Sequence, residues 1–195
     1  MKMFVLTSMT AAAALATFAW ALAPAQGEED AMAEMVKKAA RWTQPGESHK
    51  VLERFVGKWN TEMRVMGRAP ETGTAEYSWL MPGRWLQHRA SGSMMGMPVE
   101  SYSMMGYDNF KMSFVATGVS SFDTAMNRFE GDLTQDGKTL LMYGTIDEYL
   151  TGEHDKMVKY VWRFVSPEKM TFEIHDLPIG ETNTKVVEIT YTRVE

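Results

Sequence analysis

Three residues of types used in proton transfer lie close together in the middle of the chain. His88 and Arg89 are adjacent, and Glu100 follows within a dozen positions. Imidazole titrates near neutral pH, and a carboxyl group removed from water has a raised pKa, so such residues can act as general acid and base. Residues two apart share one face of a strand, so Glu100 lies on the same face as Tyr102. For His88, the sequence does not decide whether its face of the strand points inward or outward. These residues allow an enzyme that works inside the fold.

The histidines do not show the spacing of a metal site. The four are His49, His88, His154 and His175. Paired ligands on one helix or strand face are usually four or two residues apart, and no pair meets either condition. We expect His49 and His154 to be exposed and His175 to point outward. We predict no metal site and no cofactor.

Methionines offer a second kind of ligand. Five of the 18 methionines are Met94, Met95, Met97, Met104 and Met105. Thioethers suit Cu(I), but neighbouring residues of a strand point to opposite faces, so these five cannot all converge. Methionine also fills irregular apolar cores and pockets. We expect packing or an apolar cavity rather than copper.

The composition excludes several classes of function. The chain has 195 residues, 45% of them hydrophobic and 23% charged, which is typical of one globular domain. Its net charge of −5 argues against nucleic acid or an anionic membrane surface as partner. The absence of cysteine excludes thiol catalysis, disulfides and a lipid-anchored lipoprotein. No nucleotide-binding loop and no Gly-x-Ser-x-Gly motif is present, and we assign no catalytic residue.

The first 25 residues resemble an export signal. Lys2 supplies the positive start, residues 3–22 are apolar and rich in alanine, and Ala23-Pro24-Ala25 offers small residues for cleavage. An uncleaved anchor is the alternative, because the apolar run approaches the spanning length. We predict a signal peptide over residues 1–25, cleavage, a periplasmic or secreted product, and no stable membrane insertion afterwards.

A helical segment precedes the main domain. In residues 26–45, Met32, Met35 and Val36 form an apolar stripe on an amphipathic helix. A second short helix is expected after Pro45-Gly46, with Ser48 as its cap and Gly57 after its end.

From Gly57 onward the hydrophobic period is two, which predicts strands. Turn formers such as Pro82-Gly83 and Asp136-Gly137 separate them. The expected strands are residues 58–65, 74–81, 84–91, 99–107, 111–119, 125–133, 139–146, 157–165, 170–175 and 185–193. About ten short strands without helical crossovers favour an all-β, antiparallel up-and-down barrel over residues 46–195, with a β-sandwich as competitor.

Five motifs occur in order between Gly46 and Arg193. They are His-Lys-Val-Leu-Glu-Arg-Phe-Val-Gly-Lys-Trp from His49, Pro82-Gly83-Arg84-Trp85-Leu86, Met94-Met95-Gly96, Gly106-Tyr107-Asp108-Asn109, and Glu188-Ile189-Thr190-Tyr191-Thr192-Arg193. Together they resemble, over this range, a bacterial family known as domain of unknown function 1579. The family is similar to the calycins, the lipocalin and fatty-acid-binding-protein barrels of eight to ten strands around a ligand cavity.

The resemblance implies a structural floor for the barrel. Gly57 and Trp59 match the Gly-x-Trp that opens the first strand of these barrels, and Arg193 matches the arginine that packs across the indole. The family pattern commonly has Trp and Asp where this chain has Gly118 and Ser120. If these two positions face the cavity, the pocket here is roomier and less acidic than in relatives.

We therefore predict an exported protein that binds a small hydrophobic or amphipathic molecule inside a barrel. The alternatives are an enzyme that uses His88, Arg89 and Glu100, and an envelope protein-interaction module; the sequence also allows a homodimer. Nine ligand-binding candidates share an aromatic or polar side chain in a strand: Tyr77, Trp79, His88, Glu100, Tyr102, Phe114, Tyr160, Trp162 and Phe164. A filled core without a ligand is the alternative for the aromatic ones.

Overall fold

The computed structural model describes residues 26–148, 151–177 and 183–194. The expected signal peptide, residues 1–25, lies outside the described residues. The chain divides into two units between Gln44 and Pro45.

The first unit contains one described helix, α2 (Gln26–Thr43). Acidic residues in its first turn and Arg41 in its last turn complement the helix dipole. Met32, Met35 and Val36, which form the predicted apolar stripe, are exposed. Among the described helices, none has the length and apolarity needed to cross a membrane.

The second unit begins with two short turns in place of one regular helix: α3 (Glu47–Lys50) and the 3₁₀ turn η1 (Val51–Arg54). Gly46, not Ser48, occupies the N-cap, and its N–H donates to Nδ1 of His49 over 3.0 Å. The expectation that His49 is exposed is wrong, because this local hydrogen bond and edge-on packing against Tyr107 bury the ring. Burial and the nearby charge of Arg84 lower the pKa of His49.

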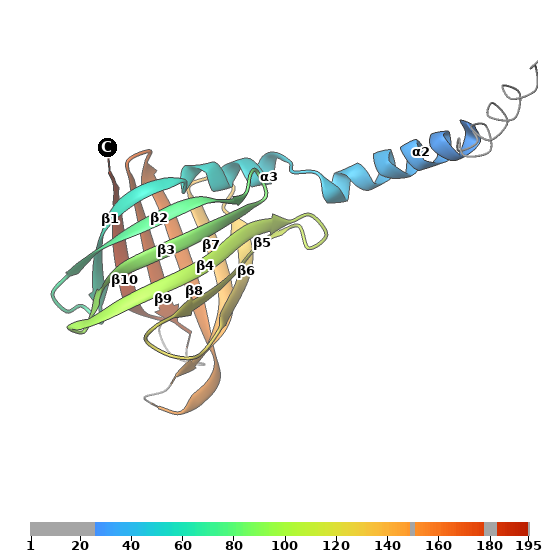
Figure 1. Cartoon of the computed structure of the whole chain (residues 1–195). Helices are drawn as coiled ribbons and strands as arrows, with labels where there is room; N and C mark the ends of the chain where they lie inside the picture. Colours follow the sequence, from blue (N-terminus) through green and yellow to red (C-terminus); the bar gives the residue numbers. More distant parts are fainter. Residues whose placement is uncertain (1–25, 149–150, 178–182, 195) are drawn as a thin grey trace, which may run out of the picture. The chain divides into compact units, whose positions relative to one another are not determined.

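Ten strands follow and form a closed barrel (Figure 1). They are β1 (Gly57–Val65), β2 (Glu71–Met81), β3 (Trp85–Met94), β4 (Met97–Asp108), β5 (Ser113–Ser120), β6 (Asn127–Leu133), β7 (Thr139–Glu148), β8 (Glu153–Ser166), β9 (Lys169–Asp176) and β10 (Thr184–Arg193). Each pairs antiparallel with the next, and β1 pairs with β10 from Trp59↔Arg193 to Val65↔Val187. The predicted up-and-down barrel is confirmed, and closure leaves no open sheet edge.

One end of the barrel is closed by η1. Leu52 and Phe55 are fully buried there, and the Trp59 indole N–H donates to the Phe55 carbonyl over 2.9 Å. The Arg193 guanidinium lies 4.1 Å from the centre of the Trp59 ring and donates to the Val56 carbonyl over 2.6 Å. A Cβ at Gly57 would lie 2.2 Å from the Arg193 guanidinium, and Gly57 has a φ of 140°, so only glycine fits.

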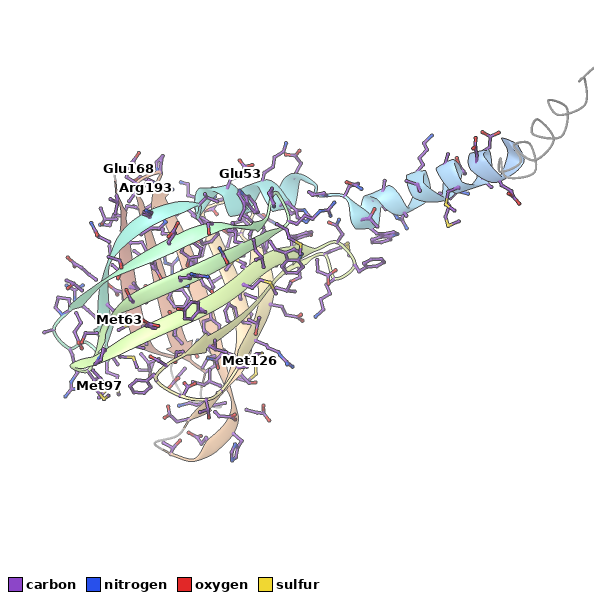
Figure 2. All side chains as sticks on the ribbon, in the orientation of Figure 1. Glu53, Met63, Met97, Met126, Glu168 and Arg193 are labelled. Carbon is purple, nitrogen blue, oxygen red and sulfur yellow. The ribbon has the colours of Figure 1, made fainter. Side chains whose placement is uncertain are left out.

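The opposite end of the barrel is the one with the turns β1–β2 and β3–β4. Figure 2 shows Met63 and Met97 at this end, and Glu53 and Arg193 at the closed end. The two ends therefore differ in the part of the chain that the structure describes: a helical turn covers one end, and turns between strands surround the other.

Candidate functional site

Half of the barrel interior is filled by aromatic rings. Phe129 of β6 stacks on Tyr160 of β8 with ring centres 4.3 Å apart, and Trp162 lies 4.4 Å from Phe172 of β9. Phe164 meets Phe55 of the floor at 5.0 Å. These rings pack on one another, and the inward residues of β5–β8 belong to the hydrophobic core.

The other half contains a cavity of about 150 Å³ near the open end. It lies against strands β1–β4 and is bounded on the far side by β9 and β10. Its lining residues at inward positions of the strands are Thr61, Met63, Glu71, Gly73, His88, Ala90, Gly92, Val99, Ser101, Phe172, Ile189 and Tyr191. A cavity of this size is on the scale of one that binds a benzene molecule in other proteins.

Small side chains account for the hollow. Three inward positions of β2 and β3 at the cavity are Gly73, Ala90 and Gly92, and Gly73 and Gly92 are direct cross-strand partners. A Cβ at Gly73 would lie 2.5 Å from the Ser91 carbonyl oxygen, so the close approach of these two strands requires glycine. The cavity is therefore bordered by backbone and methyl groups on β2 and β3, whereas the inward side chains of β8 are aromatic rings.

His88 is the central polar residue of the cavity wall. Its Nδ1 lies 3.3 Å from the Ser103 hydroxyl on β4, and its ring packs on Tyr77 with centres 4.3 Å apart. The other ring nitrogen, Nε2, is buried and has no hydrogen-bond partner among the described residues. Burial lowers the pKa of His88 to about 4, so the ring is neutral near pH 7.

Two phenols and an indole lie behind His88. Burial raises the pKa of Tyr77 to about 12, and burial together with the neighbouring Tyr77 raises the pKa of Tyr191 well above its usual value. The nearby Trp162 N–H acts against burial and lowers the pKa of the Tyr77 phenol. It has no partner with good hydrogen-bond geometry in the described part of the chain. All these groups are uncharged near pH 7.

Glu71 stands at the mouth of the cavity. Its carboxylate accepts hydrogen bonds from the Ser93 hydroxyl and from the Gly96 N–H, the latter over 3.0 Å. These two hydrogen bonds lower the pKa of Glu71, so it stays ionised near neutral pH. Among the described residues that line the cavity, none is lysine or arginine.

Seven of the nine ligand-binding candidates point into the barrel or pack against its core. Of these seven, His88 lines the cavity. The other six pack in the core instead: Tyr77, Trp79, Phe114, Tyr160, Trp162 and Phe164. The alternation of side chains correctly placed them inward, but it did not show which inward residues leave space.

The remaining two candidates, Glu100 and Tyr102, are corrected by the structure. Both are exposed on the outer face of β4, where Tyr102 packs beside Arg89 with 5.6 Å between the guanidinium and the ring centre. The inward residues of β4 are instead the small Ser101 and Ser103. The aromatic residue at 102 suggested the wrong face, because an outward tyrosine can cover a neighbouring arginine.

This register also separates the predicted acid/base group. His88 faces the cavity, whereas Arg89 and Glu100 line a hollow on the outer face together with Lys58 and Glu76. The three side chains cannot meet, because adjacent residues of a strand lie on opposite sides of the sheet.

Other groups considered from the sequence are also placed by the structure. Met105 is buried in the core while its neighbour Met104 borders a second outer hollow. His175 points outward and its Nε2 lies 2.9 Å from the Glu173 carboxylate. Within the described ranges, no three histidine, aspartate or glutamate side chains gather as metal ligands would.

The cavity residues that the sequence did not identify are mostly small or aliphatic. Thr61, Val99 and Ile189 carry no group that singles them out in a sequence. Tyr191 had a signal, because it lies two residues before Arg193 on the face that packs on Trp59. Gly118 pairs with Ser103, the partner of His88, and so faces the interior.

Comparison with known proteins places the chain among proteins of this fold. A family model described as "Protein of unknown function (DUF1579)" matches residues 44–193. No curated protein matches the chain. The crystal structure of Rv2717c from M. tuberculosis is similar over 78% of this chain and 100% of its own, with a TM-score of 0.55 and 9% identity. The S-type phycobiliprotein lyase CPES from Guillardia theta is similar over 80% and 96%, with a TM-score of 0.50 and 11% identity.

Proposed function

The chain belongs to the DUF1579 family of proteins of unknown function, and from that premise we propose that it is an exported binding protein for a small apolar or amphipathic molecule. The observation that carries this proposal is the cavity of about 150 Å³ at the open end of the barrel. The cavity is closed at the floor of the barrel and opens between strand turns at the other end. This arrangement is typical of a ligand-binding pocket.

The lining of the cavity supports a ligand that is mainly apolar. Met63, Val99, Phe172 and Ile189 supply hydrophobic contact. His88 is one of a few polar groups that could orient the molecule. The enzyme alternative has less support, because the acid/base group that it needs is split between the two faces of the sheet.

Export is proposed from the sequence of residues 1–25. Lys2, the apolar run and Ala23-Pro24-Ala25 support a signal peptide that is removed after Ala25. The intact mass of the denatured protein from the envelope of its own host tests this. A chain that starts at Gln26 is the expected result, and a full-length chain retained in the membrane fraction would contradict it.

Native mass spectrometry of the same preparation tests ligand binding. Excess mass that is released on denaturation is the expected result, and the released molecule can be identified directly. Titration of the emptied protein with toluene, followed by tryptophan fluorescence, tests the cavity as the binding place.

Two matched variants locate the binding. Ala90→Leu fills the cavity from β3 and should abolish toluene binding, while Thr74→Leu adds the same side chain to the exposed outer face of β2 and should leave it unchanged. Equal loss in both variants, or none in either, would place any binding elsewhere and overturn the proposal.

A further inference from the structure

The lining of the cavity, within the described residues, carries one formal charge near pH 7. Glu71 is the one acid among these residues, and none of them is lysine or arginine. Burial lowers the pKa of His88 to about 4 and raises the pKa of Tyr191 well above its usual value, so both side chains are neutral. The charge that a ligand meets in this lining is therefore the negative charge of Glu71.

The Glu71 carboxylate is held at the open end of the barrel. Glu71 is the cross-strand partner of Met63, which Figure 2 shows at this end. Its Oε2 atom accepts hydrogen bonds from the Ser93 hydroxyl and from the Gly96 N–H, the latter over 3.0 Å. Ser93 lies near the end of β3 and Gly96 in the turn that follows, so these bonds fix the carboxylate at the mouth of the cavity.

The carboxylate is ionised and keeps capacity for a further donor. The hydrogen bonds from Ser93 and Gly96 lower its pKa most, and the Met95 N–H and the charge of Arg68 lower it less. Both hydrogen bonds named above end on Oε2, whereas an ionised carboxylate has about four acceptor sites on its two oxygens. Glu71 is partly exposed, and within the described chain it forms no ion pair.

The hydrogen bonds at the turn do not by themselves require a charge at position 71. An amide oxygen of glutamine accepts the same two hydrogen bonds. The carboxylate adds a negative charge beside a pocket whose other described lining groups are neutral. An ammonium group at the mouth would gain a charge-assisted hydrogen bond, whereas an anion would lose water without gaining a counter-charge. The net charge of −5 of the whole chain also attracts cations.

The interior of the cavity accommodates an apolar group of the size of one ring. Val99, Phe172 and Ile189 supply apolar lining, and the volume of about 150 Å³ is on the scale of a site for benzene. A molecule that fills this volume and extends to the mouth has its far end beside Glu71.

We infer that the cavity takes a small amphipathic amine, whose ammonium group pairs with the Glu71 carboxylate at the mouth and whose apolar body lies inside against Phe172 and Ile189. This inference rests on the proposed function. It adds the charge of the ligand and the residue that selects it.

Three probes of similar size and different charge test the inference on the emptied, unaltered protein: benzylammonium, benzyl alcohol and benzoate. Calorimetric titration at pH 7 and low ionic strength should give benzylammonium an affinity about fivefold or more above that of benzyl alcohol, because a charge-assisted hydrogen bond is roughly twice as strong as a neutral one. The ratio should fall as salt is added, because salt screens a partly exposed charge pair. Benzoate should bind more weakly than benzyl alcohol. Equal affinities for the cation and the alcohol, or a preference for benzoate, overturn the inference.

Two matched variants locate the preference for a cation. Glu71→Gln keeps an oxygen for the turn and removes the charge, so benzylammonium should bind no better than benzyl alcohol, while benzyl alcohol still binds. Glu76→Gln removes the same charge from the exposed outer face of the same strand and should keep the preference. A preference that survives in Glu71→Gln, or that is lost equally in Glu76→Gln, contradicts the inference.

The outcomes separate this inference from the proposed function. If toluene and benzyl alcohol bind and benzylammonium has no advantage, the inference fails and the proposed function stands. If none of the probes binds, the proposed function fails as well. The series on the unaltered protein decides the inference even where Glu71→Gln does not fold.

Discussion

The barrel wall has the same antiparallel backbone arrangement throughout, but the size of its inward side chains differs. They are large on β5–β8, the solid half, and small on β2 and β3 at the cavity, the hollow half. Strands β6 and β8 direct Phe129, Tyr160 and Trp162 inward, and these rings stack on one another. Strands β2 and β3 direct Gly73 and Ala90 inward at the cavity. Both halves have the same antiparallel pairing, so the inward side chains alone decide where the barrel is solid and where it is hollow.

The largest expected effect comes from emptying the solid half. Trp162→Ala should lower the free energy of unfolding by about 3–5 kcal/mol, because the rings around it cannot close the void. Urea denaturation followed by circular dichroism measures this. Trp162→Phe is the control: it keeps a ring and removes an N–H that lacks a well-placed partner, so it should cost less than about 1 kcal/mol. A small loss in Trp162→Ala would show that this half is not closely packed.

Lowering the pH should lower the free energy of unfolding through His88, which lies in the hollow half. His88 has a pKa of about 4 in the folded protein and 6.5 as its ordinary value, so the unfolded chain binds the extra proton between these values. The stability from His88 is present above pH 6.5 and is lost as the pH falls toward 4, a change of about 3 kcal/mol.

Comparison with His88→Phe isolates this effect, because His49 also has a lowered pKa and acts in the same direction. Urea midpoints between pH 7 and pH 4 should fall less steeply in the variant than in the unaltered protein. Parallel curves for the two proteins would show that the His88 ring is not kept neutral by the fold.

A larger side chain should be poorly tolerated in the solid half. Ala116 of β5 faces Phe129 inside the barrel and is almost fully buried. Ala116→Leu should lower the free energy of unfolding by about 1–3 kcal/mol, because the added atoms force neighbouring rings from their preferred rotamers. Calorimetric melting detects the change, and an unchanged melting temperature would reveal unfilled space beside Phe129.

An alanine-to-leucine substitution in the hollow half should have the smallest effect on stability. Ala90→Leu places its side chain in the cavity, so its effect on the free energy of unfolding should stay within about 1 kcal/mol of zero. Buried apolar area gained in the cavity offsets the loss of side-chain entropy. A loss equal to that of Ala116→Leu would remove the difference between the halves.

The fold was predictable because its main signal is local. Alternation along Trp59, Thr61 and Met63, and along Tyr160 and Trp162, fixes strands one at a time, and turn formers mark where each ends. The site was not predictable in the same way. Whether Tyr160 meets a ring or a void depends on Phe129, which lies on a strand that is not adjacent to its own.

The register of β4 shows the other limit. A shift of one residue exchanges the faces of a strand, and β4 carries polar residues at both parities near its middle, Ser101 and Ser103 inside and Glu100 and Tyr102 outside. Hydrophobicity alone therefore gave no reliable assignment there. His88 was identifiable as a polar residue on a strand, but the hydrogen bond at its Nδ1 depends on the position of Ser103 one strand away.

The hydrogen bonds of Arg193 to the floor also affect how the barrel folds. Arg193 donates to the Val56 carbonyl from 137 positions away, and β1 has no second partner strand until β10 arrives. Contacts so distant along the chain form late and slow the folding of β proteins. A growing chain therefore cannot close this barrel before β10 has been synthesised, because β1 takes its second partner strand from β10.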